Sequence, residues 1–430
     1  MSIPTFDQIL PIVKNWRQAH DAHLNSLAWL LINRDLNGRV RLILPKTESD
    51  RHSSWDNLAS TLRQELGLHA YLPDRAMLLY ETSFDIARQG AAHWKLEGFA
   101  NTWVVDRLAT EGDWASIAPE SEGTPRFVFF SIKGGVGRST ALAATAWRLA
   151  QAGKRVLVLD LDLESPGLSS SLLPSERQPT YGITDWLVED LVGNADILIE
   201  NMFATSELSH DGEIYVVPAH GAEPGEYVSK LGRVWMPKVD SDGVRESWSA
   251  RLQRLLARLE DHILPDVVLI DSRAGIDEVA STCVTDLGAK LVLLFAMEGS
   301  QTWTGYRILF EHWRQRGVVE EMRERLQIVG AMLPELDQVD YLENLRDHGY
   351  ELFAESLYDE IPPGEAFGER WHFEAADEVA PHYPWAVKWH RSFAGLRSLQ
   401  GRLAAIDAQE VNSIFGPLIN GLVETLGEID

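Results

Sequence analysis

The sequence predicts an α/β protein: a doubly wound, mostly parallel sheet preceded by a small N-terminal α+β domain. Two observations lead to this fold class. Short runs of large aliphatic and aromatic residues, typical of strands that are buried on both faces, recur after residue 125. Amphipathic, helix-forming stretches alternate with these runs, which is the order of elements in a doubly wound sheet.

Chain length and a change in composition predict two domains. At 430 residues the chain is too long for one ordinary core. The stretch 111–125 is acidic and rich in turn-forming residues, so we expect it to be a linker. It would separate an N-terminal α+β module over residues 1–110 from a larger domain over residues 126–430, which ends in a helical tail.

The N-terminal module is expected to contain both helices and strands. Hydrophobic periodicity predicts helices over 5–22 and 54–66, and strands over 27–32, 40–44 and 76–80, with an Asn-Gly turn between the first two strands. The histidines here lack metal-ligand spacing, and no catalytic constellation is visible. By default, we expect this module to sense a signal or to dock a partner.

The most informative segment lies between a buried strand expected over 126–132 and a helix expected over 141–151. It consists of Lys133, Gly134, Gly135, Val136, Gly137, Arg138, Ser139 and Thr140. Glycines here let successive backbone N–H groups turn toward bound phosphates, and the N-terminus of the following helix attracts the same anions. We therefore expect this segment to bind the phosphates of a nucleotide, with Ser139 placed for magnesium.

Two further strands are expected to end in carboxylates. The run 156–162 ends at Asp160 and Asp162, and the alternation of a strand would point both side chains to one side. Four consecutive large aliphatic residues precede Asp271, a pattern typical of a strand that delivers an aspartate to a metal ion. Because ligands bind at the carboxyl ends of strands in open α/β sheets, these carboxylates are expected to meet the loop.

The loop sequence KGGVGRST resembles the deviant phosphate loop, K-G-G-x-G-K-[ST]-[ST], of the ParA/MinD family of P-loop ATPases, in the SIMIBI class. The resemblance implies ATP and Mg²⁺ as cofactors. It implies Ser139, Asp160 and Asp271 at the metal, and Asp162 as the residue that orients the attacking water. It also implies an ATP-dependent homodimer in which Lys133 reaches the phosphates bound by the other subunit. The implied activity is slow ATP hydrolysis that times contact with a protein partner.

Three places depart from the family pattern within the region of resemblance, residues 126–335. Arg138 replaces a lysine, which leaves open whether the chain hydrolyses ATP. Arg273 replaces a proline of the second switch loop. The segment 333–335 reads Leu-Pro-Glu where the family reads adenine with an asparagine, so adenine and guanine both remain open. Two other functions also remain open: a non-hydrolysing nucleotide sensor in a multi-component complex, such as a defence complex, and an ATP-dependent small-molecule ligase or kinase. Lys133 favours the ATP-dependent dimerising switch over the ligase or kinase, because ligases and kinases of this superfamily usually lack this lysine.

The rest of the larger domain continues the alternation. Helices are expected over 247–262 and 301–316, and strands over 290–296 and 327–333. The last stretch, 404–430, has apolar residues at helical spacing but no lysine or arginine. We expect it to dock on the protein itself, because anionic lipid would repel it.

Composition and charge restrict the binding partners and the cellular compartment that we expect for this protein. The formal net charge is −25 at pH 7, so DNA binding through a basic surface is not supported. The chain has one cysteine, Cys283, which excludes an intrachain disulfide and a cysteine-held iron–sulfur cluster. The amino terminus lacks a signal core, and no apolar run reaches the length of a membrane span. We expect a cytoplasmic protein without a membrane anchor.

Overall fold

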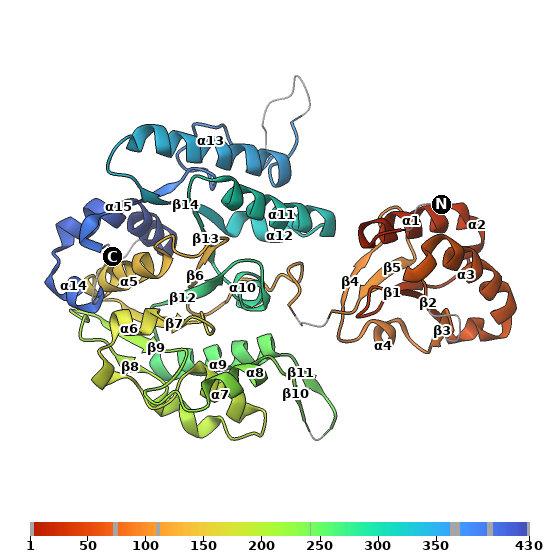
Figure 1. The fold of residues 1–430 in the computed structure, drawn as a ribbon, viewed down its shortest axis with the longest axis horizontal. Coiled ribbons are helices and arrows are strands. Elements are labelled where there is room, and N and C mark those ends of the chain that lie inside the picture. The colour runs from red at the N-terminus through yellow and green to blue at the C-terminus, as the bar shows by residue number, and fades with distance from the viewer. Residues whose placement is uncertain are drawn as a thin grey trace. The chain divides into compact units, whose positions relative to one another are not determined.

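A computed structural model gives the fold of the chain and describes residues 4–71, 76–108, 112–240, 242–361, 370–393 and 399–427. The chain divides into two compact units, Met1–Glu111 and Gly112–Asp430 (Figure 1). Each unit has its own main sheet and its own hydrophobic core. The division falls next to residue 110, where the N-terminal module was expected to end.

The first unit is built on a mixed sheet with strand order β3-β2-β1-β5-β4. Its strands are β1 (Leu30–Arg34), β2 (Val40–Pro45), β3 (Leu78–Glu81), β4 (Ala92–Lys95) and β5 (Thr102–Asp106). Its helices are η1 (Phe6–Gln8), α1 (Ile9–Ala19), α2 (Asp21–Leu24), η2 (Lys46–Arg51), α3 (His52–Leu66), η3 (Gly67–His69) and α4 (Phe84–Arg88). Strand β1 pairs antiparallel with β2 and parallel with β5.

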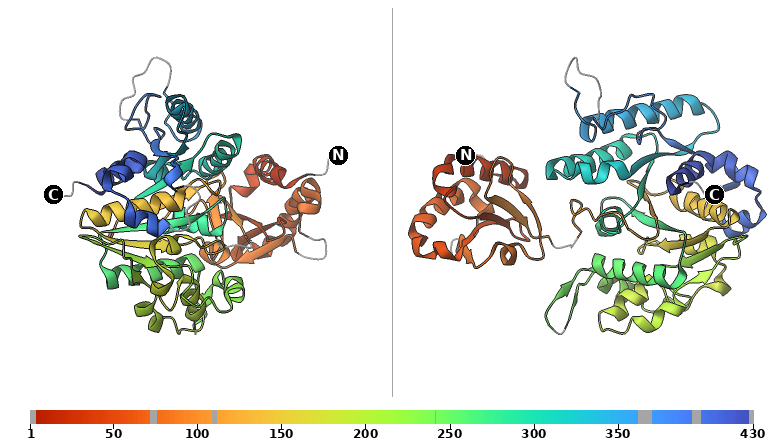
Figure 2. Two further views of the ribbon diagram at one scale, coloured as in Figure 1. Left: turned by 60° about the vertical axis from the view of Figure 1, so that its left-hand side comes forward. Right: turned by 180° about the vertical axis from the view of Figure 1, so that it is seen from behind.

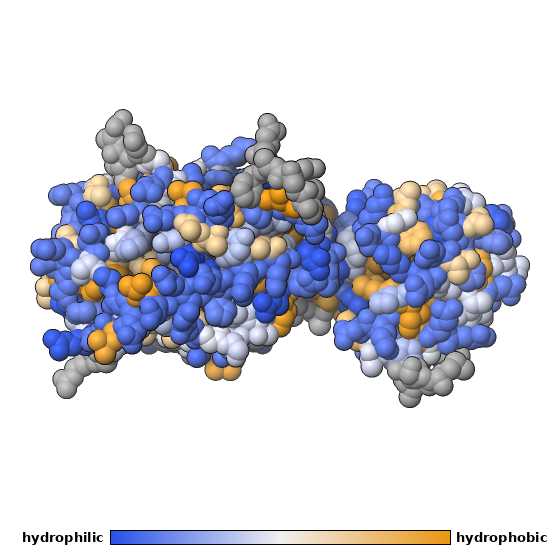
Figure 3. Space-filling view, turned by 90° about the horizontal axis from the view of Figure 1, so that it is seen from above, coloured by the Kyte–Doolittle hydropathy of each residue, from blue (hydrophilic) through white to orange (hydrophobic). Residues whose placement is uncertain are grey.

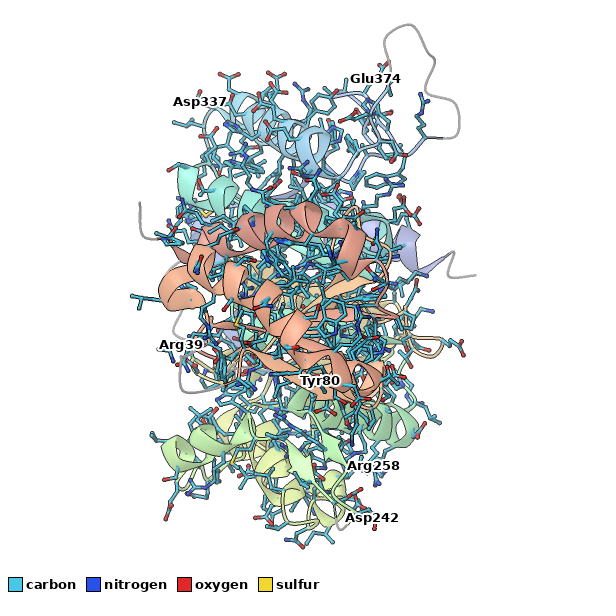
Figure 4. The ribbon with its side chains drawn as sticks, turned by 90° about the vertical axis from the view of Figure 1, so that its right-hand side faces the viewer. Arg39, Tyr80, Asp242, Arg258, Asp337 and Glu374 are labelled. Carbon is cyan, nitrogen blue, oxygen red and sulfur yellow. The ribbon has the colours of Figure 1, made fainter. Side chains whose placement is uncertain are left out.

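The main core of the first unit lies between one face of its sheet and helices α1 and α3. Trp16 of α1 and Trp55 of α3 are both buried in it. At the edge of this core, the hydroxyl of Tyr80, which is labelled in Figure 4, lies 3.0 Å from Nδ1 of His52. These contacts give the module a core of its own.

Several predicted elements of the first unit are confirmed with shifted ends. The strand over 40–44 and the helix over 54–66 correspond to β2 and α3, and the Asn-Gly turn places Gly38 in the left-handed region at φ 76°. The helix expected over 5–22 is broken at His20, whose φ of −112° and ψ of 20° leave helical geometry. Strand β1 begins at Leu30, later than expected. Strands β4 and β5 were not predicted, and the half-exposed pattern of β4 explains the weak signal.

The second unit contains a sheet with strand order β15-β14-β13-β6-β12-β7-β9-β8. Its strands are β6 (Arg126–Ser131), β7 (Arg155–Asp160), β8 (Ala204–Thr205), β9 (Glu213–Val217), β12 (Val267–Ala274), β13 (Leu291–Ala296), β14 (Leu326–Leu333) and β15 (Trp385–Lys388). Among the described strand pairs of this sheet, only β8 with β9 is antiparallel. The predicted doubly wound, mostly parallel sheet is confirmed.

Helices cover both faces of this sheet (Figure 2). One face carries α5 (Arg138–Gln151), α6 (Leu168–Leu172), α14 (Leu399–Ala405) and α15 (Ala408–Leu426). The other face carries α7 (Ile183–Asp190), α8 (Tyr227–Val234), α9 (Trp248–Ile263), α10 (Glu278–Ser281), α11 (Ser300–Arg316), α12 (Val319–Met322) and α13 (Gln338–Ser356). Alternate side chains of β6 enter the two cores: Phe127 and Phe129 on the first face, Val128 and Phe130 on the other.

Shorter elements complete the second unit. They are η4 (Ser175–Arg177), η5 (Asp196–Asn201), β10 (Lys238–Val239), β11 (Arg245–Glu246), the π-helical turn η6 (Thr282–Asp286), η7 (Arg323–Arg325) and η8 (Arg391–Phe393). Strands β10 and β11 form a separate antiparallel hairpin, with Asp242 in the turn between them (Figure 4).

The carboxyl-terminal helix docks on its own protein, as predicted. Val411, Ile414, Phe415 and Leu418 of α15 are buried in the core that also contains α5. Close packing against β15 requires a glycine at position 421, because a Cβ there would lie 2.4 Å from the indole of Trp385.

The segment expected to be a linker is attached to the second unit wherever the structure describes it. The main-chain N–H of Ala118 donates to the carbonyl of Thr285 at 2.8 Å. The indole N–H of Trp313 donates to the carbonyl of Trp114 at 2.7 Å. Residues 112–125 therefore belong to the second unit instead of forming a free linker, because these hydrogen bonds hold them on it.

Hydrophilic residues predominate on the face drawn in Figure 3, and apolar residues are scattered over it. A formal net charge of −25 agrees with this polar surface. Among the described residues, no helix combines the length and the apolar character needed to cross a bilayer.

Candidate functional site

Three neighbouring strands of the second unit end beside the glycine-rich loop. Strands β6, β12 and β7 are adjacent in the sheet; β6 ends at Ser131, β7 ends at Asp160, and β12 carries Asp271 shortly before its end at Ala274. The register pairs Asp271 directly with Asp160. The main-chain N–H of Leu161 then donates to the carbonyl of Asp271 at 3.0 Å. The two predicted carboxylate-bearing strands therefore meet at one edge of the sheet, where ligands bind in such folds.

The loop between β6 and α5 depends on glycine conformations. Gly135 and Gly137 have φ values of 76° and 78°, in the left-handed region. Among the described residues, a Cβ added at Gly134 or Gly135 would meet no atom within 4 Å. Val136 is only 2% exposed and anchors the loop to the core. Gly137 is the N-cap of α5, so the unpaired N–H groups of the first helical turn lie beside the loop.

Arg138, the first residue of α5, contacts side chains of β12 and β6 and of the turn that follows β7. Its Nε donates to Oδ1 of Asp271 at 2.6 Å, and its Nη1 donates to Oγ of Ser131 at 3.0 Å. Its Nη2 lies 3.7 Å from Oδ2 of Asp162. A planar guanidinium presents donors in fixed directions that suit carboxylates. We expected Arg138 to bind phosphate, but in this structure its donors are directed to acidic groups of the chain.

Ser139 shares the carboxylate of Asp271 with Arg138. Its hydroxyl donates to Oδ2 of Asp271 at 2.6 Å. Asp271 is 1% exposed, so both of its oxygens are buried and hydrogen-bonded. The structure therefore brings the predicted metal-binding pair of Ser139 and Asp271 together.

Asp160 is completely buried next to Asp271. Its Oδ2 accepts a hydrogen bond from the N–H of Ser169 at 3.2 Å, while Oδ1 has no hydrogen-bond partner among the described residues. Burial, and then the nearby charge of Asp271, raise the pKa of Asp160 to about 7. Burial and the neighbouring charge therefore favour the protonated form of this carboxyl in the ligand-free chain.

Asp162 lies two residues further along, where the side chain is half-buried. Burial raises the pKa of this carboxyl, and the charge of Arg138 opposes the rise. Its Oδ1 accepts a hydrogen bond from the N–H of Ser165 at 3.3 Å. Asp162 is therefore held at the site edge with part of its carboxylate accessible to solvent.

The resemblance also implies a first switch segment at residues 164–167, and Arg273 connects this segment to the second one, in which it lies itself. Its Nη2 lies 2.7 Å from Oε2 of Glu164 in the first segment, and its Nε lies 3.3 Å from Oδ2 of Asp277 in the second. Strand β12 continues through a register shift after Asp271 and ends at Ala274. At position 273 the family pattern has a proline, whereas in this chain an arginine forms ion pairs that connect the two segments.

The remaining loop residues differ in exposure. Lys133 and Gly134 are exposed at the beginning of the loop, and Thr140 is half-buried in the first turn of α5. The structure does not bring Lys133 into the group formed by Ser139 and Asp271, and its predicted role across an interface does not require that contact.

The segment 333–335, where the family places a base-reading asparagine, lies at the end of β14. Leu333 is buried, while Glu335 is exposed. Met332 just before them has φ 56°, and its sulfur would lie 3.3 Å from a Cβ added at Gly137. The end of β14 therefore lies beside the loop, but its side chains do not indicate which base binds there.

The oxygen atoms at this edge fit magnesium and phosphate chemistry. Carboxylate and hydroxyl oxygens suit Mg²⁺, which commonly takes one or two carboxylates and completes its shell with phosphate and water. The free Oδ1 of Asp160 is a buried acceptor that could bind such a water. In the part of the chain that is described, no group of three or more His, Cys, Asp or Glu residues could hold a metal ion alone. Phosphate and water would supply the remaining ligands.

Comparison with known proteins supports this assignment over the loop region. A sequence model of a family described as anion-transporting ATPases matches residues 125–176, which span β6, the loop, α5, β7 and the first switch segment. The chain carries an ATPase-type phosphate loop. The predicted resemblance to P-loop ATPases is thereby confirmed for this region.

A curated relative and two solved structures illustrate the extent of the similarity. An arsenical pump-driving ATPase of Escherichia coli is 33% identical over 110 residues, which is 26% of this chain and 17% of that protein. A ParA family ATPase from Chlorobium tepidum TLS is 15% identical, covers 71% of this chain and 100% of its own, and has a TM-score of 0.42. The septum site-determining protein MinD of Pyrococcus horikoshii OT3, complexed with Mg-ADP, is 20% identical, covers 71% and 98%, and has a TM-score of 0.42. The chain thus spans less than a fifth of the curated relative.

Sequence reasoning missed several residues of the site. Ser131 ends strand β6 after four consecutive apolar residues, and that polar residue at the strand end was the available signal. The link between Glu164 and Arg273 could not be anticipated, because nothing in the sequence relates the two positions. Tyr227, which reaches the site from α8, belongs to no motif.

Proposed function

We propose that this chain is an ATP-binding, slowly hydrolysing switch that forms a homodimer with Mg-ATP and engages a protein partner in that state. The observation that carries the proposal is the meeting of Ser139, Asp160, Asp162 and Asp271 beside the glycine loop. These residue types supply what phosphoryl transfer requires, which is positioning and charge stabilisation.

In this proposal, residues of the loop and the first turn of α5 bind the triphosphate through their N–H groups. Ser139 and Asp271 would hold Mg²⁺, and Asp160 would accept a hydrogen bond from a water of its shell. When bound, magnesium supplies positive charge that stabilises the transferred phosphoryl group. The hydrogen bond between Ser139 and Asp271 supports these roles, because it shows that both oxygens can reach one point.

Asp162 is proposed to orient the attacking water, since its carboxylate lies at the same edge and stays partly exposed. Lys133 is proposed to act on the ATP of the second subunit, as a cation supplied across the interface. Its exposure supports this role, because a side chain that acts on another subunit must be accessible.

The N-terminal unit is proposed to receive a signal or to dock the protein partner. Its separate core supports an independent module, and the loop motif lies outside it. DNA is not proposed as a ligand, because the net charge of −25 opposes binding to phosphate backbones.

A second candidate function is a nucleotide sensor that does not hydrolyse ATP. The observation that favours it is the buried contact between Arg138 and Asp271. A cation that occupies one oxygen of the metal-binding carboxylate would oppose the binding of Mg²⁺ to that oxygen. In this case ATP would bind, and the state of the protein would change without turnover.

One experiment tests the switch and distinguishes it from the sensor. ATP binding and phosphate release are measured for the wild type, for Lys133→Ala and for the control Lys46→Ala, which removes an exposed lysine of the first unit. The switch predicts that Lys133→Ala binds ATP within about threefold of the wild type but loses at least about tenfold in turnover, and that Lys46→Ala changes neither. Binding without turnover in the wild type would favour the sensor, and absence of ATP binding would contradict both functions.

A further inference from the structure

Tyr227, the first residue of α8, contacts the main chain that carries Asp162. Its hydroxyl donates to the carbonyl of Leu163 at 2.7 Å, across 64 residues of sequence. Leu163 follows Asp162 directly and is buried. A hydrogen bond at this carbonyl therefore acts on the peptide unit next to the proposed water-orienting carboxylate.

The surroundings of Tyr227 keep its hydroxyl a donor. Its ring packs edge-on against His220, with 5.3 Å between the ring centroids. Burial, followed by the charges of Asp160, Asp185 and Asp162, raises the pKa of this tyrosine. The phenol therefore stays protonated across the neutral range and can donate throughout.

The turn that contains Asp162 is held at several points. On one side, the N–H of Leu161 is bound to the carbonyl of Asp271 at 3.0 Å. Within the turn, the N–H of Ser165 is bound to Oδ1 of Asp162 at 3.3 Å. From α8, the hydroxyl of Tyr227 binds the carbonyl of Leu163, which lies between Leu161 and Ser165 in the turn.

We propose that Tyr227 is a positioning residue for the reaction, which fixes the peptide at Leu163 and thereby the carboxylate of Asp162. This inference rests on the proposed function, because it takes Asp162 as the residue that orients water. Removing the hydroxyl leaves the packing of the ring against His220 in place, so the cost to folding is limited to the loss of one hydrogen bond at the carbonyl of Leu163. A displacement of about 1 Å at a reacting group, in contrast, can reduce a rate by about a hundredfold.

The test compares Tyr227→Phe with Tyr80→Phe, a control that removes a hydroxyl bonded to His52 in the first unit. For Tyr227→Phe we expect kcat for ATP to fall at least about tenfold, KM to stay within about threefold, and the melting temperature to change by no more than about 4 °C. In the nucleotide-free protein, amide hydrogen exchange over residues 161–165 should be faster in Tyr227→Phe and unchanged in Tyr80→Phe.

The outcomes separate this inference from the proposed function. Unchanged exchange over residues 161–165 overturns the inference, and so does faster exchange with unaltered kcat, because the contact would then be only structural. Faster exchange with reduced kcat supports it. Absence of ATPase activity in the wild type overturns the positioning role and the hydrolysing switch, whereas wild-type turnover that Tyr227→Phe leaves intact overturns the positioning role alone.

Discussion

Arg138 and Asp271 form a buried ion pair in which Nε lies 2.6 Å from Oδ1, with side chains that are 8% and 1% exposed. The same carboxylate accepts the hydroxyl of Ser139 through its other oxygen. One aspartate thus holds the first two residues of α5. Arg138, the residue that departs from the family loop, therefore contacts the proposed metal ligand directly.

The first prediction concerns this pair. Arg138→Lys should raise ATP turnover by at least about fivefold, because a lysine lacks the planar fork that joins Asp271 to Ser131 and would free an oxygen for the metal. Phosphate release at saturating Mg-ATP measures the effect, with Arg148→Lys on the same helix as the control. Equal or slower turnover in Arg138→Lys would contradict this view of the pair.

The second prediction concerns pH and Asp160. Burial and Asp271 raise the pKa of Asp160 from an ordinary value of 3.8 to about 7. A carboxyl whose pKa is higher in the folded state stabilises the fold at pH values below its unfolded pKa, and this contribution is lost as the pH rises toward the folded pKa. Asp160→Asn, which cannot ionise, should therefore gain in melting temperature relative to the wild type as the pH rises from about 5 to about 7.5.

This comparison is made without nucleotide and with a chelator, so that no ligand binds the carboxylate. Above the folded pKa the difference in melting temperature should level off. A difference that stays constant or narrows across this range would show that Asp160 does not titrate as its burial implies.

The third prediction concerns the link between the switch segments. Glu164→Gln removes the negative charge that pairs with Arg273. The side chains of Glu164 and Arg273 are 47% and 32% exposed. The free energy of unfolding should change by less than about 1 kcal/mol, since partly exposed pairs contribute little. Amide exchange over residues 164–167 should nevertheless become faster. The control is Glu207→Gln, which removes an ion pair of similar exposure with Arg177 and should leave this segment unchanged.

The fourth prediction concerns Asp190, a carboxylate of the second unit that contacts Lys238, Arg251 and Arg254. Burial alone would raise the pKa of Asp190, but hydrogen bonds from Arg254, Arg251 and Lys238 outweigh it and lower the pKa to about 2. Asp190→Asn would leave the guanidinium of Arg251, which is 0% exposed, without its charge partner. Urea unfolding at neutral pH should show a loss of about 3 kcal/mol. A loss below about 1 kcal/mol, comparable with that of the exposed-pair control Glu311→Gln, would contradict the prediction.

The part of the fold that follows from local sequence could be predicted. Buried parallel strands have continuous apolar runs, so β6, β7 and β12 and the carboxylates at their ends were visible in the sequence. Short or half-exposed strands such as β4 and β15 lack that pattern and were missed. The meeting of Asp160 with Asp271 could be predicted, because neighbouring parallel strands end at the same edge.

The side-chain contacts of the site could not be predicted in the same way. The charge of Arg138 indicated an anion, but its partners Asp271 and Ser131 depend on the register of strands far apart in the sequence. Tyr227 reaches Leu163 across 64 residues, and neither residue carries a recognisable pattern. Such contacts depend on tertiary packing, which local periodicity does not describe.

The central claim is that ATP joins two copies of this chain. The mass of Asp162→Ala in Mg-ATP, measured by size-exclusion chromatography with light scattering, tests it most directly, because blocked hydrolysis should preserve the ATP-bound state. We predict a particle of twice the 48.3 kDa chain mass with Mg-ATP and of 48.3 kDa without nucleotide. A 48.3 kDa particle that carries bound ATP would contradict the account.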